Sequence, residues 1–214
     1  ATDIATIREW DVNGLQYHPI GSNCDIGQKL AEKLGIKFYD KELLLEAAKE
    51  IGINPNLLKK TDEKLPSFYI SNLSLNLGFY IQPFTSSPTS SYYDNVQKAI
   101  CDMIKNVAER ESCIIVGRCA DYLLRDNPNC INIFISASPE ACAERIVKRL
   151  PNLNIEEAKT LAKKENKLRA EYYNFYTDKE WGHSTSYDLC IDSSRIDEES
   201  AIDLIISYVK NRLK

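Results

Sequence analysis

An arginine follows a short apolar segment at the place where parallel α/β sheets bind their ligands. Residues 113–116 read Cys-Ile-Ile-Val, and Gly117 and Arg118 come directly after them. A short continuous apolar run of this kind predicts a buried strand of a parallel sheet. Ligands of such sheets bind just beyond the carboxyl ends of the strands. The planar guanidinium matches phosphate oxygens better than a lysine ammonium does, so Arg118 is a candidate anion-binding residue.

Two further arginines are placed by the next predicted strand and helix. Residues 131–135 predict a second buried strand, and Ser138-Pro139 follows shortly after it. A serine N-cap with proline at the first helical position marks the start of a helix. Arg145 and Arg149 are four residues apart in that helix, so they project from one side of it.

The rest of the chain predicts an α/β protein in which strands and helices alternate. Further strands are expected at residues 4–7, 36–40 and 187–192, and helices at residues 25–34, 41–51, 94–110, 154–173 and from 197 onward. Asn154 and Glu157 resemble a capping box at the start of the long charged helix. Alternating strands and helices predict a mainly parallel sheet with helices on both faces. The length of 214 residues fits one domain.

Composition excludes several classes of function. A formal net charge of -4 does not fit general nucleic-acid binding. The seven cysteines include no CxxC pair and no Cys/His cluster, so we expect reduced thiols rather than a structural zinc site or a disulfide framework. Neither a long apolar run nor a signal-peptide pattern is visible, and we therefore expect a cytoplasmic protein without a membrane partner.

Several ordered segments together resemble one protein family. They are residues 25–35, 38–44, 115–122, 134–145, 169–173, Trp181-Gly182 and residues 187–191. This set resembles the cytidylate kinase-like family, relatives of the nucleoside monophosphate kinases. The resemblance implies a P-loop kinase fold with a five-stranded sheet, ATP with Mg²⁺, and small-molecule nucleotides as partners. It also implies a monophosphate-side insertion at residues 41–110 and a lid at residues 151–183 of a single kinase-like domain.

The resemblance also implies roles for individual residues. The expected catalytic residues are Asp40, Arg145 and Arg169. The expected acceptor-binding residues are Asp40, Arg118, Asp121 and Gln97. The expected ATP-binding residues are Gly21, Ser22, Asn23, Cys24, Asp25, Arg149 and Lys163.

Each of these assignments has a structural alternative. Asp40 could serve only as a helix N-cap, and Arg118 could form an ion pair with Asp121. Charged helices are usually just solvated, which applies to the basic residues of the predicted lid. The aromatic residues near Tyr173 are more typical of packing than of base stacking.

The first loop departs from the kinase pattern. A P-loop reads GxxxxGK[ST], and no such string occurs in this chain. Either Gly14 ends the loop and residues 15–24 are inserted, or residues 21–24 form the loop. Both alternatives leave few glycines for close approach of the backbone to phosphate, and Asp25 adds negative charge. Asn166 is a second departure, because related lids often carry aspartate there.

Three functions are compatible with the sequence. The first is phosphoryl transfer from ATP to CMP or dCMP, which the retained Asp40, Arg118 and Arg169 favour. The second is a non-catalytic nucleotide- or phosphate-binding protein on a degenerate kinase fold, which the altered first loop favours. The third is kinase chemistry on another small acceptor, because fold does not fix substrate.

Overall fold

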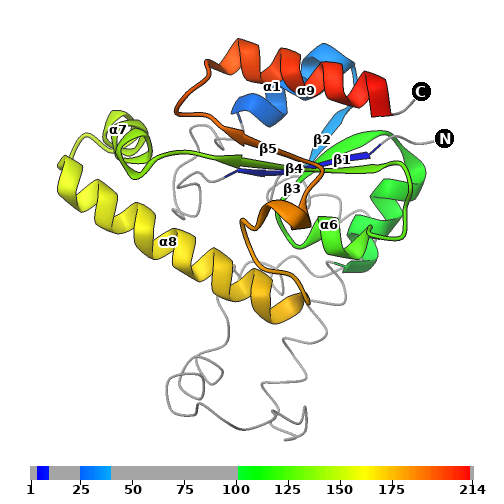
Figure 1. The fold of residues 1–214 in the computed structure, drawn as a ribbon, viewed down its shortest axis with the longest axis horizontal. Coiled ribbons are helices and arrows are strands. Elements are labelled where there is room, and N and C mark those ends of the chain that lie inside the picture. Colours follow the sequence, from blue (N-terminus) through cyan, green and yellow to red (C-terminus); the bar gives the residue numbers. More distant parts are fainter. Residues whose placement is uncertain (1–3, 10–24, 40–100, 213–214) are drawn as a thin grey trace, which may run out of the picture.

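The computed structural model of the chain describes residues 4–9, 25–39 and 101–212. Five strands in these ranges form one sheet in the order β2-β3-β1-β4-β5 (Figure 1). They are β1 (Ile4–Glu9), β2 (Lys37–Tyr39), β3 (Cys113–Val116), β4 (Cys130–Ser136) and β5 (Leu189–Asp192). All four strand pairings are parallel. The predicted α/β class with parallel strands is therefore confirmed.

Strand β3 is apolar throughout because both faces of the sheet are covered there. In β3, Ile114 belongs to the core on one face, whereas Cys113 and Ile115 belong to the core on the other. The three isoleucines of β4 that alternate along the strand, Ile131, Ile133 and Ile135, pack on the same face as Ile114. A strand buried on both faces needs no polar alternation.

Two helices cover the first of these faces. They are α1 (Asp25–Leu34) and α9 (Glu198–Arg212), which lie side by side above the sheet in Figure 1. Leu30, Ile202 and Ile205 are fully buried beneath them. The ammonium of Lys33 on α1 also pairs with Glu199 at 2.6 Å and with Asp203 at 3.2 Å on α9.

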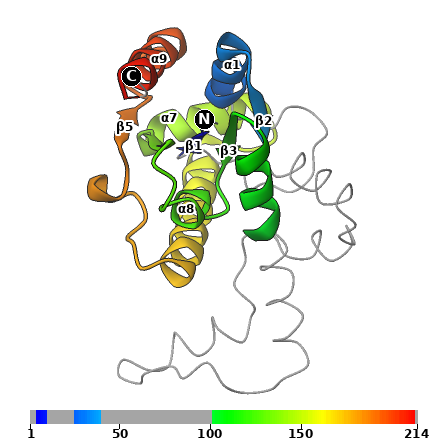
Figure 2. The ribbon, with the colours of Figure 1, turned by 90° about the vertical axis from the view of Figure 1, so that its right-hand side faces the viewer.

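The opposite face is covered by the helical residues 101–110, by α6 (Ala120–Leu123) and by the end of α8 (Ile155–Tyr176). Met103, Ile104 and Val107 pack against β3 in this second core. Figure 2 shows the sheet between the two layers. Helices therefore cover both faces, as the sequence predicts.

Helix α8 forms a pair with α7 (Pro139–Arg149). The two helices share a small core, which contains Cys142, Ala143, Ile146, Ala158 and Ala162. Both predicted caps are confirmed. The Ser138 hydroxyl accepts from the Ala141 amide at 3.2 Å. Asn154 and Glu157 form a reciprocal capping box at 2.9 Å in each direction.

Some boundaries differ from the prediction. Strand β5 begins at Leu189 rather than Tyr187. The Tyr187 ring, just before it, stacks on Phe134 at a centroid distance of 4.8 Å. The short helix α6 was not predicted, since four residues carry too little periodicity to be recognised. The helix predicted at residues 41–51 lies outside the described residues. Across the described ranges, every helix is too short or too polar to cross a bilayer.

Candidate active site

The order of the strands predicts a ligand position at the carboxyl end of β1. The chain passes from β3 on one side of β1 to β4 on the other. Ligands in open parallel sheets bind where the strand order reverses in this way. Helix α1 connects β1 to the parallel strand β2, so its N-terminus faces this same edge. A helix N-terminus there favours anions.

Arg118 follows β3 directly at this edge. Val116, the last residue of β3, is paired with Ile7 of β1. Arg118 therefore lies two residues beyond the last pairing of β3 with the central strand. Its side chain is largely buried, with 8% exposure. A guanidinium held at this edge of the sheet can bind a phosphate through two parallel hydrogen bonds.

The backbone of the Arg118 loop, which we define as residues 117–119, has an uncommon conformation. The φ angles of Gly117, Arg118 and Cys119 are 72°, 58° and 55°. Left-handed conformations cost little for glycine but about 1–2 kcal/mol for each residue with a Cβ. Such conformations persist only where the surrounding structure imposes them, and they cluster at functional sites.

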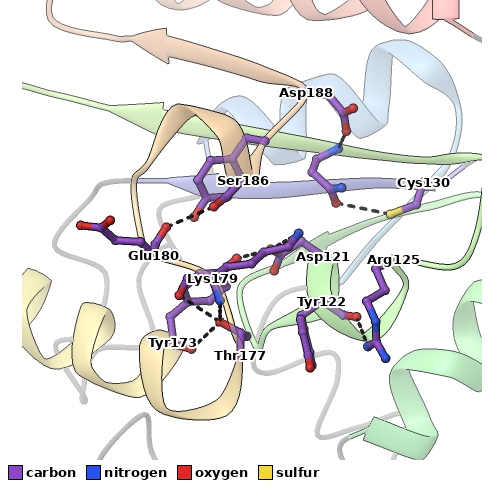
Figure 3. A network of polar contacts seen from close by, with 12 residues as sticks. Asp121, Tyr122, Arg125, Cys130, Tyr173, Thr177, Lys179, Glu180, Ser186 and Asp188 are labelled. Atoms are coloured by element: carbon purple, nitrogen blue, oxygen red, sulfur yellow. Dashed lines mark hydrogen bonds and ion pairs between the residues drawn. The ribbon is translucent and has the colours of Figure 1, made fainter.

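Asp121 lies on α6, directly after this loop, and is 1% exposed. The Tyr173 hydroxyl donates to its Oδ2 atom at 2.6 Å, and the Lys179 ammonium lies 4.0 Å from the same oxygen (Figure 3). Both contacts come from the end of α8 and the residues after it. This geometry suits a residue that joins two segments better than one that touches a substrate.

Arg145 is held by the turn that follows β5. Its two terminal nitrogens donate to the Ser193 hydroxyl at 3.1 Å and to the Ser193 carbonyl at 2.9 Å. The Ser193 hydroxyl in turn donates to the Ser136 carbonyl at the end of β4, at 2.9 Å. Through these hydrogen bonds, Arg145 connects α7 to the ends of β4 and β5. These contacts place Arg145 beside the carboxyl ends of β4 and β5, and its predicted catalytic role stays a prediction.

Asp192, the last residue of β5, places a carboxylate at the carboxyl edge of the sheet. Hydrogen bonds from the Ser194 hydroxyl and amide lower the pKa of Asp192 below its ordinary value, and the nearby Arg195 guanidinium adds to this effect. Asp192 is therefore ionised at neutral pH and contributes negative charge beside the turn.

Arg169 lies on the side of α8 that faces the protein. Ala158, Ala162 and Asn166 are buried on the same helical stripe, at spacings of four residues. One guanidinium nitrogen of Arg169 donates to Asn166 Oδ1 at 3.2 Å. Asn166, where related lids often carry aspartate, is 8% exposed and so helps to orient Arg169.

The other predicted site residues lie on helices or outside the described ranges. Arg149 and Lys163 have exposed side chains on α7 and α8. Asp25 is the first residue of α1. The remaining predicted residues, Gly21, Ser22, Asn23, Cys24, Asp40 and Gln97, lie outside the described residues.

The described ranges contain no cluster of three or more His, Cys, Asp or Glu side chains that could hold a metal ion. Magnesium in phosphoryl transfer sites is commonly held by one or two carboxylates together with the phosphates of the nucleotide.

Sequence reasoning missed two features of this site. Ser193, the partner of Arg145, is 48 residues away in the chain. Tyr173 packs in a buried cluster, as the sequence predicts, but the hydrogen bond from its hydroxyl to Asp121 was not predicted. Its position four residues after Arg169 places both on one side of a helix. That spacing was the signal that could have identified it.

Comparisons with known proteins concern the family and the fold of the chain. A sequence profile of the cytidylate kinase-like family matches residues 21–195. A cytidylate kinase from Methanothrix thermoacetophila is 30% identical over 111 residues, which is 52% of this chain and 62% of that protein. The match thus spans less than two thirds of that relative.

Solved structures show the same fold. An uncharacterized protein from Eubacterium ventriosum superimposes with a TM-score of 0.70 at 30% identity, covering 99% of both chains. The shikimate kinase from Bacteroides thetaiotaomicron has a TM-score of 0.52 at 14% identity, covering 98% of this chain and 99% of that one. This second likeness concerns the fold alone. With four fifths of its length matched by the family profile, the chain belongs to the cytidylate kinase-like family.

Proposed function

We propose that this protein transfers a phosphoryl group from ATP to a pyrimidine nucleoside monophosphate, CMP or dCMP. Membership of the cytidylate kinase-like family and the cytidylate kinase relative support a nucleotide kinase. The observation that carries the proposal is Arg118, buried in a left-handed loop at the carboxyl edge of β3. Backbone strain and a buried cation at this edge fit a residue held ready for an anion.

In the proposed reaction, Arg118 binds the phosphate of the acceptor through its planar fork. Arg169, oriented by Asn166, neutralises charge on the transferring phosphoryl group. The N-terminus of α1, with residues 21–25, receives the donor phosphates. Mg²⁺ bound to ATP supplies further charge neutralisation. Asp40 and Gln97 are proposed for the acceptor side. The predicted insertion at 41–110 and lid at 151–183 remain proposals.

Calorimetric titration tests this function directly. The full chain is titrated at fixed salt with ATP, with and without Mg²⁺, and then with CMP. Magnesium-dependent ATP binding together with CMP binding is expected, followed by turnover in an assay across the nucleoside monophosphates. Absence of CMP binding would contradict the proposed acceptor.

A second function is favoured by the altered first loop. The chain lacks a GxxxxGK[ST] string, and the family profile begins only at residue 21, after β1. A non-catalytic nucleotide- or phosphate-binding protein would retain Arg118 but lose the donor half. Binding of CMP without ATP would identify this second function.

We expect Arg169→Ala to lower kcat about 100-fold, the effect of removing one donor to a charged transition state. The same substitution removes the guanidinium group that donates to Asn166 Oδ1. This loss should lower the free energy of unfolding by about 1 kcal/mol and Tm by about 2–4 °C. Steady-state kinetics and thermal unfolding measure both quantities.

Lys167→Ala is the matched control for Arg169→Ala, because Lys167 is an exposed cation on the same helix that pairs with Glu171 at 3.8 Å. It should retain kcat and Tm. A fall in Tm for Arg169→Ala of 10 °C or more, without a specific loss of kcat, would mark Arg169 as structural.

A further inference from the structure

The residues that follow the Arg118 loop are joined to α8 by a buried hydrogen bond. The Tyr173 side chain is fully buried, and its hydroxyl donates to Asp121 Oδ2 at 2.6 Å. Cys119 packs in the same cluster as the rings of Tyr172 and Tyr173. The loop is thus held at its last residue by apolar contact and two residues further on by a hydrogen bond.

The end of α8 that supplies Tyr173 is itself well fixed. The Thr177 amide and hydroxyl donate to the Tyr173 carbonyl at 3.0 and 2.7 Å. The Lys179 amide then donates to the Thr177 hydroxyl at 3.3 Å, while the Lys179 ammonium reaches Asp121 (Figure 3). Both polar partners of Asp121 described here therefore come from one short ordered segment.

Tyr173 belongs to the same helix as Arg169. Residues four apart lie one above the other on an α-helix, so Arg169 and Tyr173 share the face of α8 that is turned toward the protein. A shift of α8 along its axis would move Arg169 and, through Asp121, would pull on the Arg118 loop. The two arginines are thus linked through one rigid helix and one hydrogen bond.

We propose that Tyr173, acting through Asp121, is a positioning residue that holds the Arg118 loop in its left-handed form and fixes it relative to Arg169. The inference rests on the proposed function for its effect on catalysis, because Arg118 is taken to bind the acceptor phosphate. Its effect on the loop can be measured without any substrate.

The first test is Tyr173→Phe, which removes one oxygen and keeps the ring. Loss of a hydrogen bond to a charged group is enough to change an equilibrium constant by about tenfold or more. We expect the Kd and KM for CMP to rise about tenfold, with the KM for ATP changed less than about twofold. The matched control is Tyr187→Phe, because the Tyr187 hydroxyl accepts from the Gly182 amide in the neighbouring aromatic cluster and does not bind Asp121.

The second test measures the loop itself. Cys119 lies in the loop and is 4% exposed, whereas Cys142 is fully buried between α7 and α8. Labelling by iodoacetamide, followed by peptide mass spectrometry, reports local opening at each site. In Tyr173→Phe we expect labelling of Cys119 to accelerate about tenfold while labelling of Cys142 stays as in the wild type.

A double variant separates positioning from stability. Tyr173→Phe leaves a buried acceptor without its donor, which can lower stability in itself. Tyr173→Phe combined with Asp121→Leu removes both partners of this hydrogen bond and leaves apolar groups in their place, while the Lys179 ammonium, which also contacts Asp121, is on a side chain that is 27% exposed and reaches water. We expect this protein to be at least as stable as the single variant, yet to show the same fast labelling of Cys119 and the same weak binding of CMP.

Each outcome decides the inference. Wild-type labelling of Cys119 in both variants would overturn it, and so would equal acceleration at Cys119 and Cys142, which reports global unfolding. A wild-type protein that does not bind CMP would contradict the proposed function. In that case, selective labelling of Cys119 would still support the Tyr173 link, and its absence would still overturn it.

Discussion

Replacing Arg118 with alanine is expected to weaken CMP binding about 100-fold, since two charge-assisted hydrogen bonds to the acceptor phosphate are lost. ATP binding should change less than about threefold, because the donor phosphates are proposed to lie at the N-terminus of α1. Calorimetric titration with each nucleotide at fixed salt measures both effects.

Two other substitutions at position 118 separate charge, shape and backbone strain. Arg118→Lys keeps the charge but not the planar fork, so CMP binding should fall by about tenfold rather than 100-fold. Arg118→Gly removes the side chain and also the cost of the φ angle of 58°. The glycine variant should therefore bind CMP as weakly as the alanine variant but unfold at a higher temperature.

Arg125→Ala is the matched control for the substitutions at Arg118. Arg125 lies seven residues after Arg118, just beyond the end of α6, and is exposed. Its guanidinium donates to the Tyr122 carbonyl at 2.8 Å and lies over the Tyr122 ring. Its loss should leave CMP binding unchanged. Equal weakening of CMP binding by the changes at Arg118 and Arg125 would mean that general positive charge, not the loop geometry, is responsible.

The sequence predicts this fold well where a local signal is strong. The strand at residues 113–116 was predicted with its observed bounds, because a strand buried on both faces is apolar at every position. The starts of α7 and α8 were predicted because their caps use side chains within three residues of each other. In these cases the physical cause lies within a few residues of chain.

The candidate site depends on contacts that no local pattern encodes. Arg145 is bound by Ser193 and Asp121 by Tyr173, pairs that are 48 and 52 residues apart. Their meeting follows from the order of the strands, which a single sequence does not specify. The contacts of Arg145 with Ser193 are therefore found only in the structure, and the predicted catalytic role of Arg145 stays a prediction.

The Arg118 loop shows a different limit. Glycine at position 117 signals that a left-handed conformation is available there. Nothing in the residue types of Arg118 and Cys119 signals that they adopt it too, since their intrinsic preference is against it. The conformation comes from tertiary contacts with α8, so only the folded structure reveals it.

Alkaline pH is expected to destabilise the protein through the buried thiol of Cys113. Burial on β3, and then the charge of Glu111, raise the pKa of this thiol from 9.0 to about 12. Because the folded pKa is higher, the unfolded state loses its proton first as the pH rises. The contribution of Cys113 is therefore fully present below pH 9 and is lost between pH 9 and about 12.

Cys113→Val tests this expectation, because valine is close in size, suits a buried strand and does not ionise. Above pH 9 the free energy of unfolding of the wild type should fall more steeply than that of the variant, by about 1.4 kcal/mol per pH unit. Urea denaturation at pH steps from about 8 to 11 measures this difference. Cys190→Val is the control, since Cys190 is exposed and should change the slope less. Parallel pH curves for the wild type and Cys113→Val would show that the thiol ionises equally in both states, which is incompatible with its complete burial in the structure.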